Sequence, residues 1–211
     1  MRRRRNKGTI VALASLAILL AGTAAVGATY ALWSDRTSVS THLQSGNLKA
    51  KLERTGLTTL TLDEGTGYLV SSTDASVIDL SGPSSNGVNA FGIGENDLVV
   101  PGAYYEAAFK LSNEGSVAFA YDVSIKLDAA SVTDLAKQIK VYVDGADKGY
   151  LCTDGNLGSH SVATGSLSKE DQAKTFTIKI AFDDLDTNNS AMEQDAKFDL
   201  SVTATQLISE D

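Results

Sequence analysis

The chain is poor in the residues that most often carry catalysis or covalent cross-links. It has one cysteine, Cys152, so no disulfide can form within the chain. It has two histidines, His42 and His160, and neither belongs to a His-Glu-x-x-His motif, so a zinc site would need an unusual ligand set. The chain has no Gly-x-Ser-x-Gly motif, and Gly92-Ile93-Gly94 lacks the third glycine of a dinucleotide loop. We therefore expect neither catalysis nor a cofactor.

Basic residues are also scarce outside the N-terminus. The first 31 residues hold five basic and no acidic residues, so the remaining 180 carry 13 basic and 26 acidic residues, a formal charge of −13. Such a surface repels nucleic acid and anionic lipid. We expect no nucleic-acid partner, and contact with the membrane only during export. The lone Cys152 is interpreted as a semi-buried strand residue rather than a nucleophile.

The N-terminal 31 residues have the three parts of an export signal. A basic head of Arg2 to Arg5 and Lys7 precedes an apolar run from residue 9 to 26, and small residues follow. Thr29 and Ala31 are the small residues that a signal peptidase accepts before a cut, so we expect the mature chain to start at Leu32. Because the run is close to the roughly 20 residues that span a bilayer, an uncleaved anchor is the alternative.

The remainder of the chain reads as strands. Apolar residues alternate with polar or small ones in four stretches, which indicates strands with one face in a core. Turn signals separate them, and no βαβ rhythm appears, so we expect an all-β antiparallel sandwich. The four alternating sets are Tyr105, Ala107, Phe109 and Leu111; Phe119, Tyr121, Val123, Ile125 and Leu127; Phe176, Ile178, Ile180 and Phe182; and Phe198, Leu200, Val202 and Ala204.

One or two short helices are expected in the connections. The first runs from about Ser131 to Lys140, with Leu135 and Ile139 on one face, and a shorter turn of helix begins at Ser168. Residues 66–96 are rich in Gly, Ser and Asn, which is typical of long loops around short strands.

The best metal candidate is an acidic stretch near the C-terminus. Asp184, Asp186 and Asn188, with Asp195 eleven residues after the first, have the spacing of a calcium-binding EF-hand loop. Asn189 stands where that loop needs glycine, and an aspartate replaces its bidentate glutamate, so we expect an exposed acidic loop and no metal site. The Ser159-His160-Ser161 run is interpreted as a solvated loop.

Three parts of the chain resemble the TasA/camelysin family of exported matrix proteins. The start of the chain is similar to that family's signal and mature N-terminus. The residues that carry this likeness are Ala28-Thr29-Tyr30-Ala31-Leu32-Trp33-Ser34-Asp35, followed by Ser45-Gly46-Asn47-Leu48. Val100-Pro101-Gly102, Phe109 and Asn113 to Ala118 resemble its central hairpin, and Phe198 to Gln206 resembles its last core strand. The resemblance implies a jelly-roll-like sandwich, cleavage by a specialised ER-type signal peptidase, and extracellular biofilm-matrix fibres.

In the family, fibres form when the mature N-terminal segment adds as a strand to the neighbouring subunit. The matching segment here is β-prone and carries four apolar residues, Leu32, Trp33, Val39 and Leu43. The resemblance therefore implies three parts: a signal peptide at 1–31, an assembly segment at 32–46 and a sandwich domain at 47–211. The partner is then a second copy of the chain, joined head to tail.

Three alternatives stay open at this point. The N-terminal segment can instead pack on its own domain. Camelysin relatives have been classed as metallopeptidases, an activity that we do not carry over because no zinc motif is recognisable. A monomeric or membrane-anchored surface binding module is the third reading.

Overall fold

The computed structural model describes residues 31–41, 47–81, 89–93, 98–131, 133–153, 156–157, 159–186, 188–191 and 193–207. Residues 1–30 of the predicted signal peptide, including Thr29, lie outside these residues, as do His42 and Leu43, whereas Ala31 is the first residue of a strand. The described part is an all-β sandwich, as predicted, and its two short helices are 3₁₀ helices in connections, Ala129–Ser131 and Asn188–Ala191. No helix among the described residues is long and apolar enough to cross a membrane.

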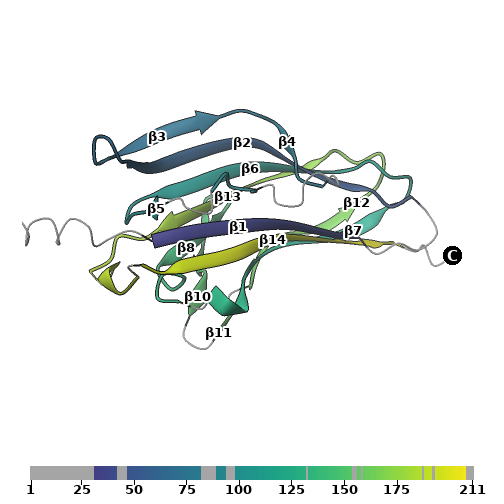
Figure 1. Cartoon of the computed structure of the whole chain (residues 1–211). Helices are drawn as coiled ribbons and strands as arrows, with labels where there is room; N and C mark the ends of the chain where they lie inside the picture. Colours follow the sequence, from purple (N-terminus) through teal and green to yellow (C-terminus); the bar gives the residue numbers. More distant parts are fainter. Residues whose placement is uncertain are drawn as a thin grey trace, which may run out of the picture.

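The first sheet places the first and last strands of the described chain side by side (Figure 1). Its strands pair in an antiparallel manner except for the N-terminal strand, which runs parallel to the C-terminal one. In spatial order the strands are β12 (Ser159–Leu167), β7 (Phe119–Leu127), β14 (Asp195–Gln206), β1 (Ala31–Thr41) and β5 (Leu98–Val99).

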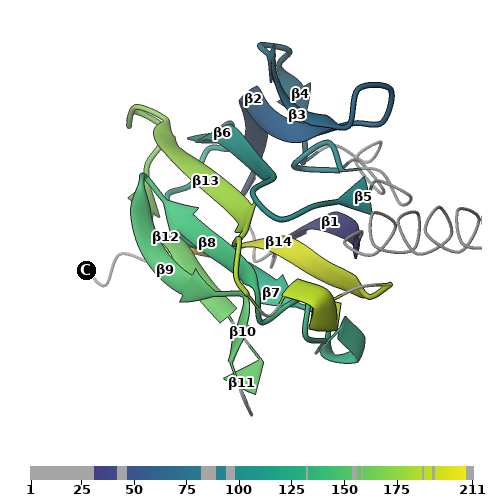
Figure 2. The same cartoon turned by 90° about the vertical axis from the view of Figure 1, so that its left-hand side faces the viewer.

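The second sheet is antiparallel throughout and faces the first (Figure 2). Two further short strands, β10 (Cys152–Thr153) and β11 (Asn156–Leu157), form a separate hairpin. In spatial order the second sheet contains β3 (Tyr68–Asp74), β2 (Ala50–Asp63), β6 (Tyr104–Asn113), β13 (Lys174–Phe182), β8 (Ile139–Val143) and β9 (Ala146–Tyr150), with β4 (Ile78–Asp79) also paired to β2.

The predicted alternation sets form the core. Every apolar member of the four sets is buried, and the residues between them in β6 and β14 are mostly half-buried or exposed. Asp144 and Gly145, with φ of 49° and 78°, form the tight turn between β8 and β9 that the sequence predicts. Cys152 is a strand residue as expected, but it is fully enclosed, with 1% of its surface exposed.

The segment from 66 to 96 contributes more to the fold than loops and short strands alone. Leu80, Ala90, Phe91 and Ile93 are all at most 1% exposed. The ring of Phe91 lies edge-on to Phe109 of the second sheet and to Phe198 of the first, with centroid distances of 5.8 and 5.9 Å. Phe91 therefore joins the two layers from a segment without strand periodicity.

The predicted helix from Ser131 to Lys140 is wrong. The chain leaves the 3₁₀ helix Ala129–Ser131 through turns, and β8 begins at Ile139. Leu135 and Ile139 are both fully buried, which explains the helical spacing, but one lies in a turn and the other in a strand. The Leu135 N–H donates to the side-chain oxygen of Gln194 at 3.2 Å, so a long-range bond replaces a helical one.

Two smaller expectations also fail. The 159–161 run is the start of β12 rather than a loop, and His160 Nε2 lies 2.9 Å from the carbonyl oxygen of Tyr150. At Ser168 the chain makes a turn instead of a helix, and within this turn the Asp171 carboxylate accepts a 2.6 Å hydrogen bond from the Ser168 N–H.

Candidate assembly site

The N-terminal strand and the edge of β14 form the candidate site. The backbone of β1 pairs with β14 in parallel over ten consecutive register positions, from Leu32 opposite Asp195 to Thr41 opposite Ala204. Figure 1 shows the two strands side by side along nearly their full length. A parallel neighbour supplies evenly spaced backbone hydrogen bonds whatever its side chains are. In this chain β14 is therefore the strand to which the N-terminal segment is paired.

The register places two of the predicted assembly residues opposite the buried face of β14. Trp33 pairs with Ala196 and Val39 pairs with Val202, and both of these β14 residues are fully buried. At these two positions the apolar residues of the N-terminal segment follow the alternation of β14, whereas Leu32 lies opposite the exposed Asp195. Leu43 is not among the described residues.

The other edge of β1 is covered only at its beginning. Among the described residues, Ala31 and Leu32 pair with Val99 and Leu98 of β5, a strand of two residues. The pairing of the segment from Trp33 to Thr41 is with β14 alone. In this single chain β1 lies on its own domain, which is the arrangement that self-packing predicts.

Backbone hydrogen bonds attach residues 47–49, which directly precede β2, to the end of β6 and the turn after it. The Ser116 N–H donates to the carbonyl oxygen of Asn47 and the Glu114 N–H to that of Lys49, both at 2.8 Å. Gly115 makes this approach possible, because a Cβ there would lie 2.1 Å from the Asn47 oxygen. We call residues 47–49 and 113–116 the anchor. Its backbone contacts fix the point from which residues 42–46 lead to β1.

An ion-pair cluster reinforces the anchor. Glu114 accepts from Lys49 Nζ at 2.7 Å and lies 3.2 Å from Lys51 Nζ. Hydrogen bonds from Lys49 first, and then from Lys51, lower the pKa of the Glu114 carboxyl from its ordinary value of 4.5. A carboxyl whose folded-state pKa is lowered stabilises the fold above its unfolded pKa, and the effect is lost as pH falls through the folded pKa.

We expect Glu114→Gln to lower the melting temperature slightly at pH 7 and to have no effect well below pH 4. The loss is small because the side chains are exposed and the pairs are screened by salt. Thermal melts of both proteins between pH 3 and 7 give the measurement, with Glu170→Gln in an exposed turn as the control. A difference from wild type that stays constant across this range would contradict the role of Glu114.

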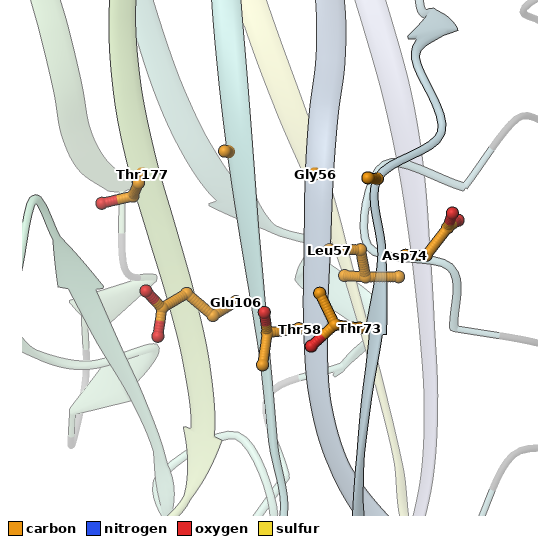
Figure 3. A pocket seen from close by; sticks show the side chains of 9 residues that line it. Gly56, Leu57, Thr58, Thr73, Asp74, Glu106 and Thr177 are labelled. Atoms are coloured by element: carbon orange, nitrogen blue, oxygen red, sulfur yellow. The ribbon is translucent and has the colours of Figure 1, made fainter.

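A shallow hollow lies elsewhere, on the outer face of the second sheet (Figure 3). Its volume is about 170 Å³. It forms at a register shift between β2 and β6, where Gly56 and Ala108 have no side chain or a small one to fill the space. The carboxylates of Glu106 and Asp74 lie on opposite sides of it. Its polar lining is otherwise hydroxyls and contains neither histidine nor cysteine. This arrangement offers no nucleophile and base in contact.

The acidic stretch with EF-hand-like spacing does not converge in the described part of the chain. Asp184 and Asp186 are exposed, and Asp195 begins β14, where its carboxylate lies 3.6 Å from Lys197 Nζ. Asn188 begins a 3₁₀ helix. Among the described residues, no three His, Cys, Asp or Glu side chains are close enough to hold a metal ion.

The sequence did not reveal that β14 is the strand paired with the N-terminal segment. The predicted core residues of β14 are correct, but their alternation does not reveal which strand lies beside them. The one sequence signal that could have suggested this pairing is that both the N-terminal and the C-terminal segments are rich in β-prone residues. Comparison of the chain with protein-family models, with curated proteins and with solved structures finds no match.

Proposed function

We propose that this chain is a secreted structural subunit of an extracellular fibre, of the biofilm-matrix kind suggested by its resemblance to the TasA/camelysin family. In this proposal residues 32–46 leave their own domain, and β1 adds to the β14 edge of the next subunit. The observation that carries the proposal is the ten-position parallel pairing between a terminal strand and an edge of the same domain.

Exchange of this strand is topologically simple. β1 is the first described element, and residues 42–46 join it to the anchor, so it can leave without threading through the sandwich. A vacated β14 edge presents its backbone groups to any copy of the same strand, which is the basis of strand addition and domain swapping. Because donor and acceptor are different surfaces, the contact repeats head to tail and gives a filament.

The composition agrees with this role. An export signal, a formal charge of −13 on the mature chain and no recognisable catalytic motif are the features of a secreted building block. Fibres made without intrachain disulfides depend on the core and on contacts between subunits for stability.

Processing should occur between Ala31 and Leu32. We expect N-terminal sequencing of the released protein to begin at Leu32, because Thr29 and Ala31 present the small side chains that the peptidase needs. Ala31→Leu should block the cut and retain the chain in membranes. Recovery of the unaltered chain at full length in membranes would favour an uncleaved anchor.

A reversible covalent staple tests the assembly mechanism. Ser38 and Ser201 are register partners in β1 and β14. Neighbouring strands lie about 4.8 Å apart, within the roughly 4.4–6.8 Å between Cα atoms that a disulfide spans. The mature Ser38→Cys/Ser201→Cys chain, oxidised as a dilute monomer, should stay monomeric in electron micrographs and form fibres after reduction.

The matched control moves one cysteine along the same strand. Ser38→Cys/Thr205→Cys carries the same number of thiols, but its two positions are four residues out of register, too far to bridge. It should form fibres in oxidising and reducing conditions alike. Fibres of normal appearance from the fully stapled protein would rule out exchange of β1.

A further inference from the structure

Strand β3 is an exposed edge without the usual protection against pairing. It is the outermost strand of the second sheet (Figures 1 and 2), and all seven of its residues are exposed. Tyr68, Leu69 and Val70 expose 74%, 38% and 48% of their surface. An edge with this much apolar surface is a template for pairing with another strand.

Two other edge strands, β9 and β12, carry protective features that β3 lacks. β9 holds Asp147 and Lys148, and β12 has a register shift between Ser161 and Ala163. Charges and bulges of this kind discourage further pairing at an edge. The run from Tyr68 to Thr73 has no charge and no proline, and its register with β2 is continuous.

We propose that β3 pairs in an antiparallel manner with β3 of a second copy of this chain. A second copy fits this edge because the uncharged run from Tyr68 to Thr73 can face itself without bringing like charges together. Two copies of a mature chain at −13 repel each other, so they approach most easily along a strip without charge. Asp74 is the sole charged residue of β3, and Arg54 Nη2 lies 3.6 Å from its carboxylate.

The same charge selects the orientation. An antiparallel pair centred on Ser71 places Asp74 of one copy opposite Tyr68 of the other, so the two carboxylates sit about 20 Å apart at a rise of about 3.4 Å per residue. A parallel pair in register would bring them side by side. The antiparallel pair is self-complementary, with the same residues contributed by both copies.

This interface is separate from the proposed exchange of β1. β3 belongs to the second sheet and β1 to the first, so both contacts can exist at once. In a fibre, every subunit would present its β3 edge at a regular spacing. Many weak pairs acting together would then join one fibre to its neighbour.

Disulfide trapping tests the pair in the mature chain. Ser71→Cys should form disulfide-linked dimers under mild oxidation faster than Ser161→Cys, the control on the exposed edge strand β12. Adding Val70→Asp to Ser71→Cys should slow the linkage about tenfold, because the added carboxylate lies diagonally across the pair from both its own copy and Asp74 of the other chain. Adding Val70→Thr, which keeps a neutral β-branched side chain, should leave the rate unchanged.

Equal linkage rates for Ser71→Cys and Ser161→Cys, or a rate unaffected by Val70→Asp, would overturn the β3 pair. The outcome is separable from the proposed function. If the Ser71→Cys linkage forms while the stapled β1 chain still makes fibres, the strand exchange fails and the β3 pair stands. If stapling abolishes fibres and the Ser71→Cys linkage does not form, the reverse holds.

Discussion

A chain that begins at residue 47 should remain folded and should form no fibres. The four alternating strands that build the core, β6, β7, β13 and β14, all lie after this point, and the anchor is retained. What the deletion removes is ten register positions on the β14 edge, whose backbone groups can then bond to water. Circular dichroism should show native strand content, and electron micrographs should show no filaments.

The vacant edge of the deletion variant should bind its missing strand from solution. A synthetic peptide of residues 32–43 should bind saturably and raise the melting temperature, whereas a scrambled peptide should do neither. Trp33→Ala in the peptide should weaken binding by about 30-fold, equivalent to about 2 kcal/mol, if the Trp33 side chain contributes most of the binding energy of the contact. An unfolded deletion variant, or one that still makes normal fibres, would show that residues 32–46 belong to their own core.

Phe91→Ala should be the most damaging single substitution in the core. Phe91 has no exposed surface, and its ring contacts Phe109 and Phe198 from the two opposed sheets. Removing such a ring leaves a cavity between the layers and typically costs about 3–5 kcal/mol. That is a large part of the roughly 5–15 kcal/mol by which domains are stable. Urea unfolding of the monomeric protein provides the measurement.

Two controls define the Phe91 result. Phe91→Leu keeps most of the volume and should cost less than the alanine variant. Val77→Ala lies in the same part of the chain but is 63% exposed, and it should change the unfolding free energy by about 0.5 kcal/mol or less. A loss below about 1 kcal/mol for Phe91→Ala would mean that this segment does not join the layers.

The alternating strands could be predicted because the order of apolar and polar residues within each strand reflects which of its faces is buried. A residue such as Ile125 is apolar between polar neighbours, since one face of β7 meets the core and the other does not. Phe91 could not be found in this way, because its neighbours are Ala90 and Gly92 rather than the polar residues of an alternating strand, and its burial comes from packing between the two layers. The spacing of Leu135 and Ile139 predicted a helix wrongly. Both residues are buried, but Leu135 lies in a turn and Ile139 in the strand that follows it.

The candidate site was only half accessible to sequence reasoning. The apolar and β-prone character of the segment from Leu32 predicted a strand there, and the structure has β1 at this place. Its partner lies more than 150 residues away in the chain, and backbone hydrogen bonds carry no sequence signal that would identify it. The parallel pairing with β14 and the unprotected edge of β3 therefore required the three-dimensional arrangement.

The most direct test of strand exchange mixes two single-cysteine variants. Ser38→Cys carries its thiol on β1 and Ser201→Cys on β14, the register partner. The buried Cys152 remains in both. If β1 of one subunit pairs with β14 of the next, fibres grown from the mixture and then oxidised should yield disulfide-linked dimers containing one chain of each variant. Fibres that form from the mixture and yield no such mixed dimer would contradict strand exchange between subunits.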